Sequence, residues 1–107
     1  MPLPARPFAP VAAAPGVVRQ VLADSPGLMV VANDFSAGAE GAPHHHPHLQ
    51  ATYVQSGRFA FTVAGKTFEV GPGDCFVVPS NAEHGCKALE AGRVIDSFTP
   101  RRDDFLA

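Results

Sequence analysis

The sequence predicts a single all-β domain of the barrel or sandwich class, on the basis of three observations. Eleven prolines and ten glycines divide the 107 residues into short segments. No apolar pattern with the 3.6-residue period of a helix persists for three turns. The segments between the breaks are rich in Val, Phe and Thr, which is typical of strands. A chain of 107 residues is long enough to bury a core without a disulfide or a structural metal.

Eight short strands are expected, separated by turns of identifiable chemistry. Ser56-Gly57 and Ala64-Gly65-Lys66 suit tight hairpins, since glycine tolerates a positive φ. Gly71-Pro72-Gly73-Asp74 ends one strand before the next begins. The expected strands, in chain order, are Val17–Leu22, Leu28–Phe35, Leu49–Gln55, Arg58–Val63, Thr67–Val70, Cys75–Val78, His84–Leu89 and Arg93–Thr99.

The remaining features of the chain narrow its class and location. Residues 1–15 are proline-rich and are expected to form an arm, either frayed or lying across a partner subunit, ahead of one domain at residues 16–107.

A net charge of −2 without a basic stripe argues against nucleic acid as a partner. No segment is apolar enough for a membrane span or a signal peptide, so a cytoplasmic protein is expected. Cys75 and Cys86 are expected to be buried free thiols.

The most prominent feature is a cluster of histidines. His44, His45, His46 and His48 fall within five residues, and His84 follows on a later predicted strand. Side chains alternate along an extended chain, so His44, His46 and His48 share one parity with Gln50 and can converge, whereas His45 must point away. Pro47 bends the chain and leaves open which of them reach the centre. Imidazole is a common ligand of transition metals, and the alternative is a solvent-facing loop of histidines without a metal.

The spacing around the cluster resembles a pair of known motifs. The first runs Gly38-x5-His44-x-His46-x3-Gln50-x6-Gly57, and the second runs Gly73-x5-Pro79-x-Asn81-x2-His84. Both are similar to the signature motifs of the cupin superfamily, with Gln50, Asn81 and Ala88 replacing the usual Glu, Gly and Asn. The resemblance implies a small jelly-roll barrel. It also implies one divalent transition metal, which can be Zn, Ni, Fe, Mn or Co, held by His44, His46, Gln50 and His84.

The parity of the last predicted strand leaves a second group of residues open. If Val94 and Phe98 face the barrel lumen, then Asp96 does too, which is costly for a carboxylate unless it contacts a metal, a cation or a substrate. If Ile95 faces inward instead, Asp96 is an ordinary surface acid. The sequence alone does not decide between these two orientations.

A narrower resemblance covers most of the chain. Segments Gly16–Leu22, His46–Gly57 and Asp96–Phe105 look like those of the pectin-degradation cupins of the KdgF type. That family converts 4,5-unsaturated monouronates, released by pectate or alginate lyases, into linear 5-keto-4-deoxyuronate. The resemblance implies that Asp96, Phe98 and Arg102 line the pocket. We hypothesise that Asp96 moves a proton and that Arg102 clamps the substrate carboxylate. Phe98 would pack on the sugar, and His48 is expected to be a pocket group or to orient a neighbouring ligand. From the residues alone, Phe98 is equally well a core aromatic and Arg102 a solvated tail residue.

The expected ligand set also bears on the substrate. Because Gln50 replaces a carboxylate with a neutral amide, the charge of the metal stays uncompensated, which favours a small anionic sugar. A difference of one unit charge, felt by a charged group about 6 Å away, is worth roughly 3 kcal/mol at an effective dielectric near 20. Two rival functions are a cupin dioxygenase with a redox metal and a non-catalytic sugar-acid binding barrel. A homodimer is expected, since small barrels expose apolar sheet faces and edges.

Overall fold

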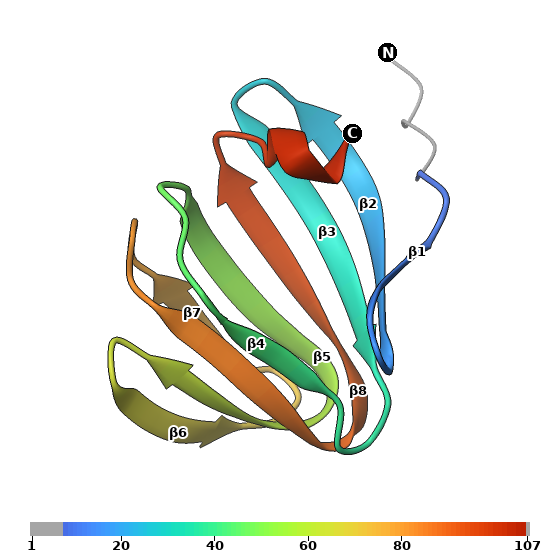
Figure 1. The fold of residues 1–107 in the computed structure, drawn as a ribbon, viewed down its shortest axis with the longest axis vertical. Helices are drawn as coiled ribbons and strands as arrows, with labels where there is room; N and C mark the ends of the chain where they lie inside the picture. The colour runs from blue at the N-terminus through green and yellow to red at the C-terminus, as the bar shows by residue number, and fades with distance from the viewer. Residues whose placement is uncertain (1–7, 107) are drawn as a thin grey trace.

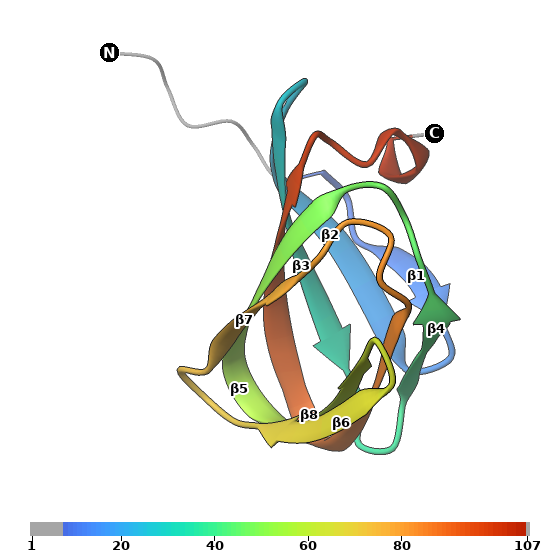
Figure 2. The ribbon, with the colours of Figure 1, turned by 90° about the vertical axis from the view of Figure 1, so that its left-hand side faces the viewer.

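The computed structural model describes residues 8–106, which form eight strands and one short helical turn. The turn, η1, spans Asp103–Phe105. Figures 1 and 2 show the strands curling into a barrel with η1 at one end. The strands are β1 (Val11–Ala14), β2 (Val17–Ser25), β3 (Leu28–Phe35), β4 (Glu40–His44), β5 (Leu49–Val63), β6 (Lys66–Val70), β7 (Cys75–Val78) and β8 (His84–Thr99).

The barrel has two layers that share the long strands β5 and β8. The sheet runs in the order β1-β2-β3-β8-β5-β6, with β4 paired to β8 and β7 paired to β5. The first half of β8 pairs with β4 and its second half with β3, while β5 pairs with β7 at its start and β6 at its end. Each long strand therefore passes from one layer to the other, which closes the jelly-roll barrel.

Two glycines allow the long strands to bend. Gly57 has a φ of +79°, and the register between β5 and β8 shifts around it. A Cβ on Gly57 would lie 2.6 Å from the Ala91 carbonyl oxygen, and one on Gly92 would lie 2.1 Å from the Ser56 carbonyl oxygen. Larger residues cannot occupy either position without moving the backbone, so these glycines mark a bulge where the strands cross closely.

The predicted division into strands was wrong at this bulge. The expected hairpin at Ser56-Gly57 does not form, because Gly57 bends one continuous strand, β5. Likewise the segments predicted as His84–Leu89 and Arg93–Thr99 are a single strand, β8. The hairpin predicted at Ala64-Gly65-Lys66 is confirmed: it joins β5 to β6, and Ala64 and Gly65 both have positive φ.

Two strands were not predicted. β4 was missed, and β1 falls in the range expected to be an arm. β1 pairs with β2 in register Val11↔Arg19, so this part of the range belongs to the sheet. The rest of the arm, residues 1–7, lies outside the described residues.

The barrel interior has a polar layer between two apolar clusters. One cluster includes Val54 and Val94, and the other includes Val31 and Phe98, with η1 residue Phe105 packed against it. Along β8 the inward residues run Val94, Asp96 and Phe98, all buried. An acidic side chain therefore lies between two apolar ones inside the barrel. This confirms the first of the two orientations left open by the sequence.

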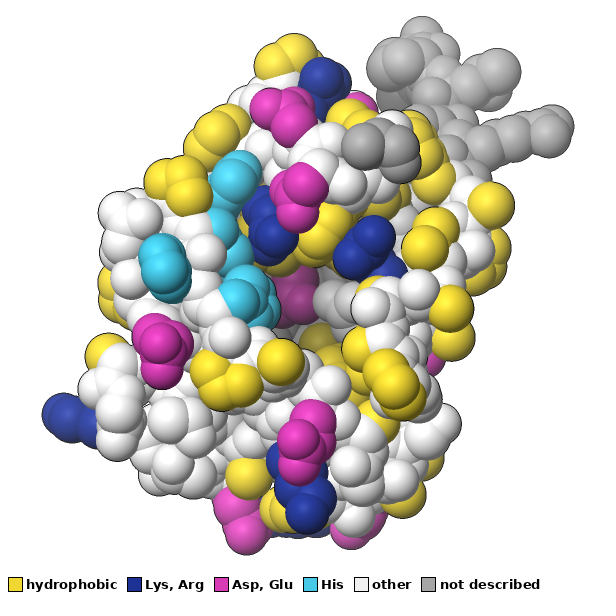
Figure 3. Space-filling model, viewed as in Figure 1, with side chains coloured by type: hydrophobic (Ala, Val, Ile, Leu, Met, Phe, Trp, Pro, Cys, Tyr) yellow, Lys and Arg dark blue, Asp and Glu magenta, His cyan; other side chains and the backbone are white. Residues whose placement is uncertain are grey.

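The outside of the barrel carries exposed apolar side chains. Leu49, Tyr53 and Val77 are 45–59% exposed on the neighbouring strands β5 and β7. They fit the apolar outer face from which a homodimer was expected, and the dimer stays a prediction. Among the described residues, no helix has the length and apolar character needed to cross a bilayer. One face of the molecule is hollowed, with histidines along the hollow and basic side chains beside it (Figure 3).

Candidate metal centre and adjoining cavity

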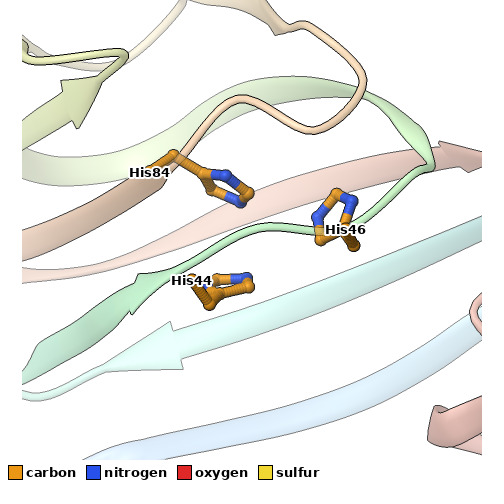
Figure 4. A group of neighbouring side chains, drawn as sticks. All are labelled: His44, His46 and His84. Carbon is orange, nitrogen blue, oxygen red and sulfur yellow. The ribbon is translucent and has the colours of Figure 1, made fainter.

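Three histidines from two neighbouring strands and a loop meet at one point. His44 ends β4, His84 begins β8, and the two face each other in the β4–β8 register. His46 follows in the segment between β4 and β5. One ring nitrogen from each lies within 4.8 Å of the others, and Figure 4 shows the three rings turned toward one another. The expected convergence of His44, His46 and His84 is therefore confirmed.

The backbone fixes which nitrogen each ring presents. Nδ1 of His44 lies 2.9 Å from the carbonyl oxygen of Ala42, and Nδ1 of His84 lies 2.9 Å from that of Ala82. A carbonyl only accepts, so Nδ1 carries the hydrogen in a neutral ring and Nε2 presents its lone pair. Nε2 of His84 is buried and has no hydrogen-bond partner among the described residues. Such a buried acceptor is what a metal ligand requires.

His46 and Gln50 together make the strongest argument for a cation. Nδ1 of His46 lies 3.2 Å from the carbonyl oxygen of His48, and its Nε2 lies 3.0 Å from Oε1 of Gln50. A neutral imidazole has one N–H, so it can donate to only one of these two oxygens. A cation bound to both Nε2 and Oε1 removes the conflict while Nδ1 donates to the carbonyl.

The orientation of the Gln50 amide follows from its other contacts. Its Nε2 donates to Oγ1 of Thr52 at 3.0 Å and to Oδ1 of Asp96 at 3.2 Å. Rotating the amide would set its oxygen against the Asp96 carboxylate, which is unfavourable. Oε1 is therefore held toward the histidines, and Gln50 is available as the fourth ligand predicted from the sequence.

Burial keeps two of the rings neutral. Burial, together with the positive charge of Arg102, lowers the pKa of His46 to about 4. Burial likewise lowers the pKa of His84, against a hydrogen bond with Ala82 that raises it. Neutral imidazole is the form that binds a metal. The donor set of three imidazoles and one amide oxygen fits a divalent transition metal.

Asp96 lies next to this centre and is held by three donors. Oγ1 of Thr52 donates to its Oδ1 at 2.7 Å, Nε2 of Gln50 donates to the same oxygen, and Nδ2 of Asn33 donates to its Oδ2 at 2.8 Å. Burial raises the pKa of Asp96 above its ordinary value, and these hydrogen bonds offset part of the rise. The carboxyl group is thus fixed in position but able to bind a proton.

A cavity of about 340 Å³ connects the metal ligands with Asp96. This volume lies at the lower end of the range for small-molecule sites. His44, His84, Gln50 and Asp96 all line it. The predicted pocket residues Phe98 and Arg102 line the cavity as well, together with Arg19, Asn33, Asp104 and Phe105.

Arg102 is a structured residue and not a solvated tail residue. Its guanidinium donates two hydrogen bonds to Asp104, at 2.9 and 3.1 Å, and its side chain is only 11% exposed. It also stacks 4.2 Å from the centroid of Phe105 and 5.2 Å from that of Phe98. Phe98 itself is 3% exposed, so it is both a core aromatic and a wall of the cavity.

The structure places other sequence-predicted residues outside the cavity. His48 is not among the lining residues; its Nε2 donates to the carbonyl oxygen of Arg101, and its own carbonyl faces His46. His45 is exposed, as its parity predicted. Cys86 is half-buried and burial raises its pKa to about 11, whereas Cys75 is exposed, so the expectation of two buried thiols was wrong for Cys75.

Three residues of the site were missed by the sequence analysis. Asn33 and Thr52 hold Asp96, and Arg19 lines the cavity. A signal for Arg19 exists in the sequence, because it shares the parity of Val17 and Val21, which both face the core. Asn33 and Thr52 have no such signal on their own, since their role depends on which strands pair.

Comparison with known proteins places this arrangement in a family. A model of the cupin domain matches residues 34–98, which is more than half of the chain. The chain belongs to the cupin family. This cupin is also 40% identical over 93 residues to the pectin degradation protein KdgF of Dickeya dadantii (strain 3937), covering 85% of this chain and 84% of that protein. It is therefore a member of the KdgF family, as its motifs predicted.

Two solved structures are similar to this cupin over nearly their whole length. KdgF from Halomonas sp. matches with a TM-score of 0.87 and 42% identity, covering 92% of this chain and 91% of that one. An RmlC-like cupin from Shewanella frigidimarina NCIMB 400 matches with a TM-score of 0.88 and 38% identity, covering 91% and 87%. The predicted jelly-roll fold is confirmed.

Proposed function

We propose that this cupin is a metal-dependent enzyme that linearises 4,5-unsaturated monouronates, from pectin or alginate, to 5-keto-4-deoxyuronate. The observation that carries the proposal is one cavity lined by histidines that could hold a metal ion, a buried carboxyl group and arginines. The similarity to a pectin degradation protein supports the substrate class. The cytoplasmic location expected from the sequence stays a prediction.

The reaction requires proton movement but no oxidant or second substrate. The bond between C1 and the ring oxygen breaks, the C1 hydroxyl loses its proton, and C1 becomes an aldehyde. The ring oxygen remains on C5 as an enol, which becomes a ketone when C4 gains a proton. The net change moves one hydrogen from the C1 hydroxyl to C4. A site for this reaction therefore needs a group that accepts and returns a proton, and positive charge near the sugar oxygens.

A metal held by the four neutral ligands would provide the positive charge. A divalent metal held by His44, His46, His84 and Gln50 would act as a Lewis acid toward sugar oxygens. None of these four side chains is negatively charged when it binds a metal. The centre as a whole is therefore cationic, and this favours an anionic substrate.

Asp96 is the proposed proton-transfer group. Its Oδ1 accepts from Thr52 and Gln50, and its Oδ2 accepts only from Asn33 among the described residues. Oδ2 therefore keeps room for a further proton or hydrogen bond. Because burial raises the pKa of Asp96, the protonated form is more accessible than for a surface Asp, which suits a group that accepts a proton and then donates it.

Arg102 and Phe98 are the proposed substrate-positioning residues. The guanidinium of Arg102 can bind a uronate carboxylate in the planar geometry typical of such pairs, and Phe98 offers an apolar wall for the sugar ring. His48 is proposed to act indirectly, because its carbonyl faces Nδ1 of His46 and orients that ring, as groups around metal ligands commonly do.

A turnover assay tests the proposal. Metal-loaded protein is mixed with unsaturated monouronate generated by a pectate lyase, and the ultraviolet absorbance of the ring double bond is followed. We expect the absorbance to fall faster than in buffer, with no uptake of oxygen. Uptake of oxygen would indicate a dioxygenase instead. Binding of the sugar without any acceleration would indicate a sugar-acid binding barrel, and either result would refute the proposed activity.

A further inference from the structure

Arg19 is a cation of the cavity that the sequence analysis gave no role. It lies on β2 between Val17 and Val21, which are both buried. Its side chain is half-buried and lines the cavity. Burial lowers the pKa of Arg19, and the charges of Asp104 and Arg102 act on it in opposite directions. An arginine stays protonated even so, so a full positive charge is present at the cavity.

Arg19 differs from the other arginines of residues 8–106 because it forms no ion pair with a carboxylate. Among residues 8–106, every other arginine lies within 3.1 Å of a carboxylate oxygen. The guanidinium of Arg19 makes no ion pair or side-chain hydrogen bond with any of these residues. The four pairs are Arg58 with Glu69, Arg93 with Asp34, Arg101 with Asp24, and Arg102 with Asp104.

The charge balance at the cavity therefore identifies Arg19 as the cation that is available to an anionic ligand. Arg102 is already compensated by the two hydrogen bonds that it donates to Asp104. Arg19 has five N–H donors, makes no ion pair with a carboxylate of residues 8–106, and is partly removed from water; Asp104 acts on it only through its charge. Half-buried charges without a partner are unfavourable, so an anionic ligand that binds Arg19 would gain a charge-assisted hydrogen bond.

The two arginines border the same part of the cavity. The central guanidinium carbon of Arg19 lies 4.0 Å from the centroid of the Phe105 ring, and that of Arg102 lies 4.2 Å from the same centroid. The two carbons therefore cannot be farther apart than the sum of these distances. Both arginines line the cavity next to Phe105. In Figure 3, basic side chains lie on either side of the hollow, with an acidic side chain recessed between them.

We propose that Arg19 recognises the carboxylate of the uronate, with the Arg102–Asp104 pair as its neighbour, and thereby determines the preference for acidic over neutral sugars. This inference rests on the proposed function for the identity of the substrate. It differs from the resemblance-based role of Arg102, because it gives the main charge recognition to the arginine that has no carboxylate partner.

Binding of unreactive sugars tests Arg19 without requiring turnover. Galacturonate and galactose differ in whether C6 is a carboxylate, and neither has the ring double bond. We would titrate each sugar into metal-loaded wild-type protein, Arg19→Gln, Arg19→Lys and the control Arg58→Gln by calorimetry. Wild type should prefer galacturonate. Arg19→Gln should weaken galacturonate binding about tenfold or more and leave galactose binding unchanged, while Arg58→Gln should match wild type for both sugars.

The two Arg19 variants separate charge recognition from packing against Phe105. Arg19→Lys keeps the charge and loses the planar stack, so it should retain part of the preference for galacturonate. In turnover of the unsaturated monouronate, Arg19→Gln should raise KM with little change in kcat. Three results would overturn the inference: equal binding of the two sugars by wild type, unchanged galacturonate binding by Arg19→Gln, or equal weakening of both sugars in both variants. If the Arg19-dependent preference is found but no turnover, only the proposed function fails.

Discussion

Replacing Asp96 with Asn separates the chemistry of this residue from its structural role. Asn has the same shape but cannot carry a proton between substrate atoms. Loss of a positioned acid–base group typically costs about 10²- to 10⁴-fold in rate. We expect a decrease in kcat of that order for Asp96→Asn. The metal content should stay unchanged, because Asp96 does not belong to the group of residues that could hold a metal ion.

The hydrogen bonds around Asp96 show why Asn is the better test than Ala. Asp96→Ala would leave the donors of Thr52, Gln50 and Asn33 without an acceptor, at about 1–3 kcal/mol each. That loss is a large share of the roughly 5–15 kcal/mol by which a domain is stable. In Asp96→Asn, the amide oxygen still accepts from Thr52 and Gln50, and a rotated Asn33 amide accepts from the new N–H. We therefore expect a change in Tm of only a few degrees.

The pH dependence of stability provides a second readout for Asp96. Burial raises the pKa of Asp96 in the folded protein, so its contribution to stability is fully present below its ordinary pKa and is lost as the pH rises through the raised value. Asn has no such dependence. The Tm of Asp96→Asn relative to wild type should therefore increase with pH, measured on metal-free protein because metal binding itself depends on pH. Turnover of Asp96→Asn within tenfold of wild type would refute the proton-transfer role.

Two further predictions concern the metal centre. Gln50→Glu should bind the metal more tightly but raise KM for the uronate, because the added negative charge is worth about 3 kcal/mol at about 6 Å; an unchanged KM would show that the neutral amide does not tune substrate binding. Burial lowers the pKa of His46 to about 4, so stability from its neutral form is present above about 6.5 and is lost as the pH falls toward 4. As the pH falls from about 6.5 to 4, the Tm of metal-free wild type should therefore decrease more than the Tm of His46→Gln. Parallel curves of Tm against pH would contradict the lowered pKa of His46.

The strands with clear boundaries were predictable from the sequence. Leu28–Phe35 and Cys75–Val78 form with the predicted bounds because turn residues flank their apolar runs. β4, at Glu40–His44, has no apolar alternation and contains a glycine and a proline, so its extended form depends on pairing with β8. Gly57 looked like a turn because local sequence does not show that the strand continues beyond a bulge.

The site was predictable where it depended on spacing and not where it depended on pairing. The convergence of His44 and His46 follows from their spacing, because an extended chain repeats its direction every second residue. His84 was expected to join them from the spacing of the second cupin motif. The orientation of Asp96 was undecided because Ile95 is also apolar and lies half-buried on the outer side. Asn33 supports Asp96 only because β3 pairs with β8, and that pairing is a property of the whole fold.

Metal content is the most direct test of the central claim that His44, His46, His84 and Gln50 form one metal site. Protein loaded with Co²⁺ or Zn²⁺ and freed of excess ion should retain about one equivalent per chain, measured by elemental analysis. The variants His46→Ala and His84→Ala should retain much less, while His45→Ala, which removes an exposed histidine of the same cluster, should match wild type. Wild type without retained metal, or equal retention by His84→Ala and His45→Ala, would contradict the account.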